Sequence, residues 1–260
     1  MSTGYHWLNF DRREQLDVFP FDTNIERTSS CFVGNEYTEA VLTLLAGDWA
    51  GAANAFMPDC FTARDLDDAG RPPFLARAAD EFGEYIFDEA EDSFAYVEGR
   101  FKLMEGRLQR TYPDDWPLYI DEPYEGPFDL ELSHPRYVVN RTKREYVDRD
   151  HTMVWFIRRR PYPFEVVRFD PTPLLLCTDG FLDDYYDRGP WLGDYVYASN
   201  VHPGDGYRDA TRDYIYTIGP ERPVYATDDQ IKAVMERRED DYGNLTPQEI
   251  EDIKGCLRQY

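Results

Sequence analysis

Lysine is the scarcest charged residue in this 260-residue chain, which has four lysines among its 28 basic residues. The 51 acidic residues outnumber the basic ones and give a net charge of −23. A surface of that sign repels nucleic-acid phosphates and anionic membranes, so it argues against both as partners. It attracts basic proteins and cations. Excess acid with little lysine also fits a protein adapted to high salt, whereas a GC-rich genome would explain the arginine bias but not the net charge.

Cysteine and histidine are equally sparse, with four residues of each. The cysteines are too far apart for a zinc knuckle or a C-x-x-C redox pair and read as free buried thiols; they are Cys31, Cys60, Cys177 and Cys256. No basic segment followed by an apolar run opens the sequence, and the longest apolar stretch, residues 40–46, is too short to span a bilayer. We therefore expect a cytoplasmic protein with no membrane association and no cofactor.

Aromatic residues are abundant, at 16% of the chain within an apolar share of 42%. Disordered chains carry far fewer, so a packed globular protein is expected. Residues 5–10 and 14–19 read as two strands that flank a turn, and residues 137–140 and 145–148 repeat this β-hairpin.

Helical patterns accompany the hairpins, so the predicted class is α+β. Residues 37–45 place apolar side chains on one face after a start signal at Asn35, and residues 228–239 form another candidate helix. Thr246 and Glu249 have the spacing of a capping box at the start of a last helix. Further strands are predicted at residues 152–157, 164–169 and 174–177.

Several short matches indicate an internal duplication. Residues 8–17 match residues 139–148 at an offset of 131, and residues 104–107 match residues 235–238 at the same offset. The identical hairpin residues are Asn9, Arg13, Glu14 and Asp17 in the first copy and Asn140, Arg144, Glu145 and Asp148 in the second. Two weaker matches pair residues 85–96 with 214–225 and Trp49-Ala50-Gly51 with Trp191-Leu192-Gly193.

The predicted organisation is two tandem, divergent copies of a unit built from a β-hairpin, an antiparallel sheet and flanking helices. The first copy takes residues 1–118 and the second takes residues 136–260. Residues 119–135 between them are rich in proline and acid, as is typical of a linker.

Residues 137–146, Y-V-V-N-R-T-K-R-E-Y, and residues 189–194, G-P-W-L-G-D, carry a resemblance. Together they resemble a group of small proteins with a V-N-x-T-K-K-E-Y strand-turn-strand followed by a W-x-G-D turn. The resemblance implies an architecture and no known activity. The first copy departs from the pattern, since Asp11, Gln15 and Ala52 stand where the motif has Thr, Tyr and Asp.

Two groups of residues are candidates for a functional site. The W-x-G-D turn, with Trp191, Gly193 and Asp194, is the first. The second is a set of metal-ligating or acid–base residue types, Asp183, Asp184, His202 and Asp205. An acidic run is also what a solvated loop carries, and most histidines of so acidic a chain have an aspartate nearby.

The matched hairpin residues have a simpler explanation in the fold. An asparagine at a strand end bonds the turn backbone, and arginine and glutamate on neighbouring strands pair across the ladder. We therefore expect an acidic interaction protein without catalytic activity, such as an immunity or inhibitor protein that binds a basic partner. The alternatives are a metal-dependent or carboxylate-based hydrolase with a site near residues 191–194, and a structural or virion component that assembles through aromatic surface.

Overall fold

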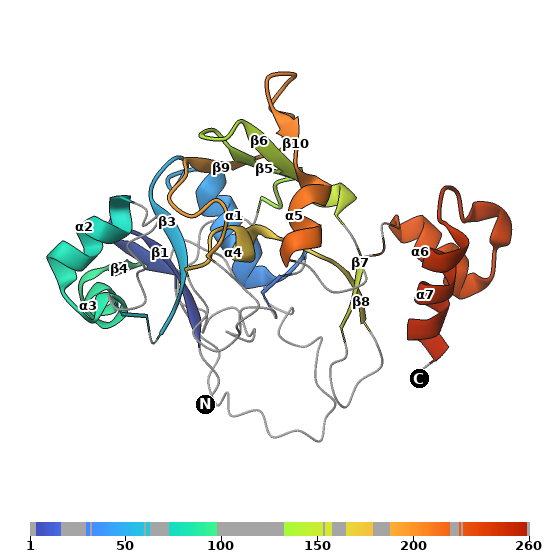
Figure 1. The fold of residues 1–260 in the computed structure, drawn as a ribbon, viewed down its shortest axis with the longest axis horizontal. Helices are drawn as coiled ribbons and strands as arrows, with labels where there is room; N and C mark the ends of the chain where they lie inside the picture. Colours follow the sequence, from blue (N-terminus) through green and yellow to red (C-terminus); the bar gives the residue numbers. More distant parts are fainter. Residues whose placement is uncertain are drawn as a thin grey trace.

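The computed structural model describes residues 4–16, 30–31, 33–59, 61–62, 73–97, 133–152, 154–157, 165–178, 188–218, 224 and 226–258. These residues form two four-stranded sheets, a two-stranded sheet and the helices α1 to α7 (Figure 1). The predicted α+β class is confirmed.

The first sheet has the strand order β3-β1-β2-β4. Strand β1 pairs antiparallel with both β2 and β3, and β2 pairs parallel with β4. The strands are β1 (Tyr5–Asn9), β2 (Glu14–Leu16), β3 (Asn54–Pro58) and β4 (Ala95–Tyr96). The predicted hairpin is therefore present, with its turn at residues 10–13.

The second sheet repeats this arrangement, with the order β10-β6-β5-β9 and the same strand directions. Its strands are β5 (Tyr137–Asn140), β6 (Glu145–Asp148), β9 (Val196–Ser199) and β10 (Arg208–Asp209). Asn9 lies opposite Glu14 in the first sheet, as Asn140 lies opposite Glu145 in the second. The two tandem, divergent units expected from the sequence are thus present.

The two units do not keep one offset to their ends. Ala95 of β4 lies opposite Glu14, and its equivalent Arg208 of β10 lies opposite Glu145, only 113 positions later. The predicted match of residues 85–96 with 214–225 is therefore wrong. Residues 86–93 form α3 (Ile86–Ser93), before β4, whereas residues 211–218 form α5 (Thr211–Ile218), after β10. The proposed match of residues 104–107 lies outside the described residues.

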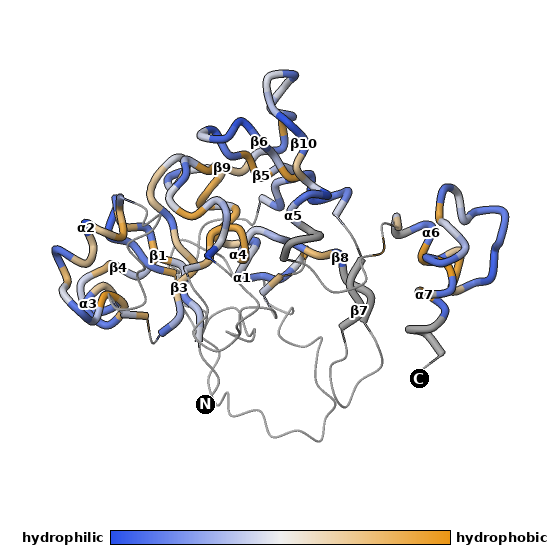
Figure 2. The backbone as a smooth tube through the Cα atoms, in the orientation of Figure 1, coloured by the Kyte–Doolittle hydropathy of each residue, from blue (hydrophilic) through white to orange (hydrophobic). Residues whose placement is uncertain are grey.

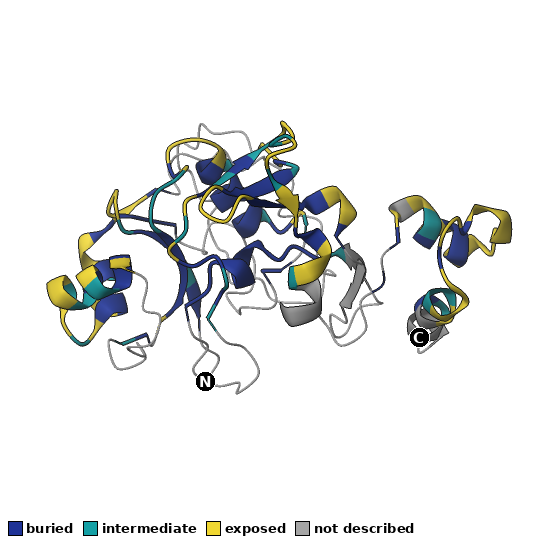
Figure 3. Cartoon of the chain, turned by 45° about the horizontal axis from the view of Figure 1, so that its top comes forward, coloured by how far each residue is buried: buried dark blue, intermediate teal, exposed yellow. Residues whose placement is uncertain are grey.

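A single core joins both units around α1 (Glu36–Ala46). This helix begins after Asn35, whose side chain accepts a hydrogen bond from the Thr38 amide, and it ends at Gly47, as the sequence predicts. Its apolar side chains share one cluster with the inner faces of both sheets, where Trp7 and Trp191 are completely buried. Figure 3 shows buried residues concentrated in α1 and the two sheets.

Helices α2 (Pro73–Phe82) and α3 are inserted between β3 and β4. Their apolar side chains form a second cluster with the outer face of the first sheet, which includes Leu8, Ala55 and Met57. Both helices lie beside that sheet in Figure 1. One side of each helix is therefore buried, and the opposite side faces solvent.

The second unit has its own insertion between β6 and β9. It contains the 3-10 turn η4 (Arg149–His151), the strands β7 (Val154–Ile157) and β8 (Glu165–Arg168), and α4 (Thr172–Leu175). The two strands are where the sequence predicts them. The strand predicted at residues 174–177 is wrong, because residues 172–175 form a buried helical turn and only Cys177 makes a β-bridge, to Phe56.

The C-terminal residues form a helical pair, α6 (Asp228–Glu236) and α7 (Pro247–Arg258), joined through η5 (Glu239–Asp241). Their buried side chains form a separate cluster with none from the sheets. Figure 2 shows apolar stretches where the two helices face each other. The predicted capping box at Thr246 and Glu249 is present, with hydrogen bonds of 2.7 and 3.2 Å.

The described end of the predicted 119–135 linker packs against the protein. The Ser133 amide donates to the Thr43 hydroxyl at 3.0 Å, and the Pro135 carbonyl accepts a hydrogen bond from Arg149. Residues 119–132 lie outside the described part of the chain. Within that part, no helix is long and apolar enough to cross a membrane.

Candidate functional site

The two β-hairpin turns have the same internal geometry. The Asn9 side chain accepts a hydrogen bond from the Arg12 amide at 2.9 Å, and Asn140 accepts one from the Lys143 amide at the same distance. Arg13 and Arg144 both adopt the left-handed conformation, with φ of 54°. The matched asparagines therefore close the turns, as expected. Asp17 lies outside the described residues.

The W-x-G turns are equivalent in the same way. The Trp49 indole donates to the Glu14 carboxylate at 2.7 Å, and the Trp191 indole lies 3.4 Å from the Glu145 carboxylate. Each tryptophan is followed two residues later by a glycine with positive φ, 72° and 85°. The matched glutamates therefore anchor a buried tryptophan to the hairpin in each unit.

Glu145 is the polar centre of the tryptophan–glutamate contact in the second unit. It also accepts hydrogen bonds from the Tyr214 hydroxyl and from Arg208. Burial raises the pKa of Glu145, but these hydrogen bonds outweigh it, so the net pKa is lowered. Burial and the bond to Glu145 raise the pKa of Tyr214 to about 12. At neutral pH the site thus holds an ionised carboxylate bonded to a neutral phenol.

Asp194 of the W-x-G-D turn is bonded to the neighbouring β-hairpin. Its carboxylate accepts a hydrogen bond from the Asn140 amide at 2.7 Å and lies 3.8 Å from the Lys143 ammonium. In the first unit, where the motif aspartate is missing, Asn54 accepts the equivalent bond from Asn9 at 2.9 Å. Asn54 stands two residues after Ala52, which takes the place of the motif aspartate. A neutral acceptor from another position thus replaces the charged one, which indicates that the hairpin asparagine needs an oxygen acceptor rather than a reactive acid.

The predicted metal-ligating residues are only partly described. Asp183 and Asp184 lie outside the described residues. His202 packs edge-on against Tyr146; its Nε2 lies 3.2 Å from the Tyr146 hydroxyl, and its Nδ1 accepts the Gly204 amide at 3.0 Å. Asp205 is exposed. Among the described residues, no group of three or more metal-ligating side chains is assembled.

Asp148, at the end of β6, contacts two basic side chains. It accepts a bidentate pair of hydrogen bonds from Arg136, at 3.0 and 2.8 Å, and lies 2.7 Å from Nδ1 of His151. Burial raises the pKa of Asp148, but its bonds to Arg136 and His151 outweigh that effect and the net pKa is lowered. The ionised Asp148 carboxylate therefore stabilises the folded state.

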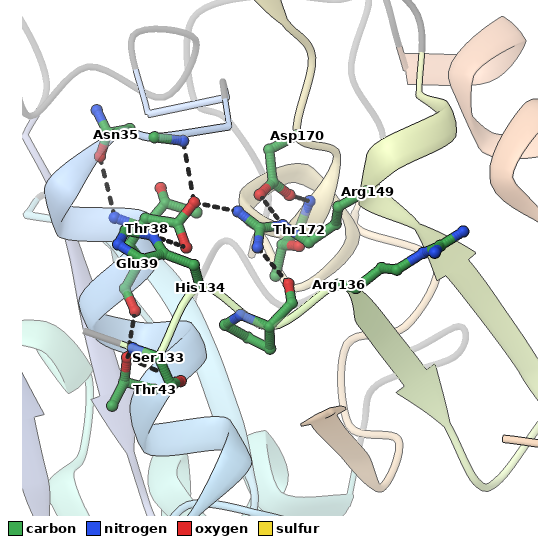
Figure 4. Close-up of polar contacts among 12 residues, drawn as sticks. Asn35, Thr38, Glu39, Thr43, Ser133, His134, Arg136, Arg149, Asp170 and Thr172 are labelled. Atoms are coloured by element: carbon green, nitrogen blue, oxygen red, sulfur yellow. Dashed lines mark hydrogen bonds and ion pairs between the residues drawn. The ribbon is translucent and has the colours of Figure 1, made fainter. Parts of the chain in front are cut away.

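A buried ionic network ties the two units together, and sequence patterns did not reveal it (Figure 4). Arg149 donates to the Asp170 carboxylate at 2.7 Å and to the Glu39 carboxylate of α1. All three side chains are at most 3% exposed. His134, at the rim, places Nδ1 3.2 Å from Glu39. No local pattern marked it, because Glu39 lies on the side of the predicted helix opposite its apolar residues 37, 40, 41, 44 and 45.

The exposed sides of α2 and α3 form the most acidic described surface. Residues 80–92 contain seven acidic residues and no basic one, and most of the acids are exposed. They are Asp80, Glu81, Glu84, Asp88, Glu89, Glu91 and Asp92. Tyr85, 56% exposed, stands between Glu84 and Asp88 in the sequence, and Tyr96 of the following strand β4 is 51% exposed. We call these seven acids and two tyrosines the acidic helix face.

Comparisons of the chain with protein-family models, with curated proteins and with solved structures find no match. The resemblance of the hairpin and the W-x-G-D turn to a group of small proteins therefore stays a prediction. The described acidic residues singled out from the hairpins and the W-x-G-D turn are bonded within the fold, whereas most acids of the acidic helix face are exposed.

Proposed function

We propose that this chain is an acidic interaction protein that binds a basic protein partner in the cytoplasm without transforming it chemically, as an immunity or inhibitor protein does. The acidic helix face carries the proposal. The apolar sides of α2 and α3 are used against the first sheet, so their acids present a fixed negative surface to solvent. Such a surface steers a basic partner and selects for it.

The exposed tyrosines make this face more than a solvated acidic run. Tyr85 lies between the acids that end α2 and begin α3, and Tyr96 lies in β4, which follows α3; both are more than half exposed, whereas most large apolar side chains are buried. Tyrosine is enriched among the residues that dominate binding energy at interfaces, because it adds apolar contact and a hydroxyl with little entropy loss. Together they supply short-range contact where the carboxylates supply long-range attraction.

The experiment compares two variants of equal net charge. One neutralises four acids of the face, Asp80→Asn, Asp88→Asn, Glu89→Gln and Asp92→Asn. The other neutralises four acids of the C-terminal helical pair, Glu239→Gln, Asp240→Asn, Asp241→Asn and Glu251→Gln. Binding to a compact basic test protein, cytochrome c, is measured by calorimetry at physiological salt.

We expect the face variant to bind at least about tenfold more weakly than the C-terminal variant, since its charges act within a Debye length of the contact. Tyr85→Ser should weaken binding with no change in charge. Equal losses in the two charge variants would mean that attraction follows net charge alone, and the proposal would be wrong.

A further inference from the structure

The internal duplication supplies a template for what covers each sheet. In the first unit, the outer face of the sheet is covered by α2 and α3: the His6 ring lies 4.9 Å from Phe87, and the Gln15 amide donates to the Glu91 carbonyl at 2.7 Å. In the second unit β9 ends at Ser199 and β10 begins at Arg208. Only eight residues connect these two strands, and in the described chain no helix lies on the outer face of the second sheet (Figure 1).

Tyrosines stand at the positions that the helices cover in the first unit. The register makes Tyr137, Tyr146 and Tyr197 the equivalents of His6, Gln15 and Ala55. With Val139 and Tyr207 they form an apolar cluster, the tyrosine face. Tyr137, Val139 and Tyr146 are buried within the chain, so the accessible part of this face is made by the half-buried Tyr197 and Tyr207. His202 of the short connection covers it in part, through edge-on contacts with Tyr137 and Tyr146.

The rim of the tyrosine face exposes large apolar side chains. Tyr195, equivalent to the helix-contacting Ala53, is 63% exposed, and Val201 is 75% exposed. These are two of the five most exposed large hydrophobic residues in the described chain. Tyr195 precedes β9 and Val201 follows it, so exposed apolar side chains stand at both ends of this strand. Exposed apolar surface rimmed by polar groups is typical of an interaction site.

The charge at this rim is opposite to that of the chain as a whole. Residues 136–144 contain Arg136, Arg141, Lys143 and Arg144 and no acid. The Arg141 guanidinium lies 4.6 Å from the centre of the Tyr197 ring. Among the described residues no acidic side chain pairs with Arg144, whereas its equivalent Arg13 pairs with Glu81 of α2.

We propose that the tyrosine face is a docking site for an acidic amphipathic helical segment of a partner protein. The occupant would lie as α2 and α3 lie on the first sheet, with apolar side chains over Tyr195 and Tyr197 and an acid on Arg144. Electrostatic screening over about 8 Å at physiological salt lets such a segment respond to the basic turn rather than to the net charge of −23. Asp205 and Asp209 lie at the opposite edge and would repel an acid there. The acidic end of the bound segment therefore points toward the basic turn.

This site is separate from the acidic helix face and takes a partner of the opposite charge. A single chain thus carries two complementary surfaces on its two units, one for a basic and one for an acidic partner. A long single-stranded nucleic acid also suits aromatic and basic side chains, but its evenly spaced phosphates would meet the acids at the β10 edge.

The test uses the full chain and a fluorescent synthetic peptide with the sequence of residues 73–93, an acidic amphipathic helical segment known to fit the equivalent face. A matched peptide with every Asp and Glu replaced by Asn and Gln serves as control. Fluorescence anisotropy is measured with the wild type, Arg144→Glu and Tyr195→Ser. Lys232→Glu matches the charge change of the first variant on α6, and Met235→Ser matches the second, because Met235 is a large apolar residue of the same helix that is 58% exposed.

We expect saturable binding of the acidic peptide at micromolar concentrations, at least tenfold weaker for Arg144→Glu and for Tyr195→Ser and unchanged for the two control variants. Binding that is absent up to millimolar protein, or is equal in all variants, would overturn the proposal. Displacement of the peptide by oligo-dT in an Arg144-dependent manner would assign the face to nucleic acid instead. A dimer that Arg144→Glu dissociates would assign it to a second copy of this chain.

Discussion

Replacing Arg149 by methionine removes the only cation of the buried network while keeping much of the side-chain volume. The Glu39 and Asp170 carboxylates would remain, 1% and 0% exposed, with the half-exposed His134 ring, 3.2 Å from Glu39, as the remaining basic side chain of the network. Removing one partner of a buried ion pair costs about 3–5 kcal/mol, and here one arginine serves two carboxylates. Since a typical domain is stable by about 5–15 kcal/mol, we expect Arg149→Met to lose a third or more of its stability.

The assay is urea denaturation followed by tryptophan fluorescence, because Trp7, Trp49 and Trp191 are fully buried in the core that both units share. Arg136→Met is the matched control. Arg136 is 38% exposed and bonds to one buried carboxylate, so its loss should cost about 1 kcal/mol.

A triple variant separates charge from packing. Glu39→Gln with Arg149→Met and Asp170→Asn removes all three charges and keeps acceptors for the Gly34 and Thr172 amides. It should recover most of the lost stability, because a buried pair replaced as a whole is often neutral. A loss below about 1 kcal/mol for Arg149→Met, or a triple variant no better than the single one, would refute the reasoning.

Further predictions concern packing and pH. Gly189→Ala should cost about 2–3 kcal/mol, because a Cβ would meet backbone carbonyl oxygens of α4 at 2.5 Å, whereas Gly206→Ala, with open space around it, should stay within about 0.5 kcal/mol; thermal unfolding compares the two. Because the pKa of Asp148 is lowered in the folded state, its ionised carboxylate stabilises the fold fully above the unfolded-state pKa, and this stabilisation is lost as pH falls through the folded-state pKa. In Asp148→Asn, the free energy of unfolding from urea titrations should therefore decrease less between about pH 5 and 3 than in the wild type. The hydrogen bond of the neutral Tyr214 phenol to Glu145 stabilises the fold fully below the ordinary phenol pKa near 10, and this stabilisation is lost as pH rises through the raised pKa of about 12. Tyr214→Phe should therefore remove a phenol step near pH 12 from an ultraviolet titration.

The local parts of the fold could be predicted from the sequence because short-range rules decide them. The hairpins at Asn9 and Asn140 follow from turn chemistry, and the helix after Asn35 follows from its cap and its 3.6-residue period. The paired W-x-G turns could also be detected in the sequence, because the glycine that adopts a positive φ stands two residues after the tryptophan in both units.

The parts that sequence patterns missed depend on contacts between distant residues. Residues 174–177 have the composition of a strand, but the close approach of Gly189 to α4 and the bridge from Cys177 to Phe56 leave room for a helical turn only. The Arg149 network joins residues over 100 positions apart, and no local pattern marks a buried cation. The false match of residues 85–96 with residues 214–225 arose because α2 and α3 occupy one unit alone.

The backbone bonds between the units have a consequence for synthesis on the ribosome. Strand β3 is completed by hydrogen bonds from Phe56 to Leu176 and from Thr178 to Phe56, and the Gly51 amide donates to the Val196 carbonyl. The first unit is fully translated by residue 97, yet these partners emerge some 100 residues later, about 5–20 seconds at ordinary elongation rates. During that interval the side chains of α1 and β3 that pack against the second unit have no partner, so the nascent chain is a natural client for holding chaperones, and two separately expressed halves would be soluble only together.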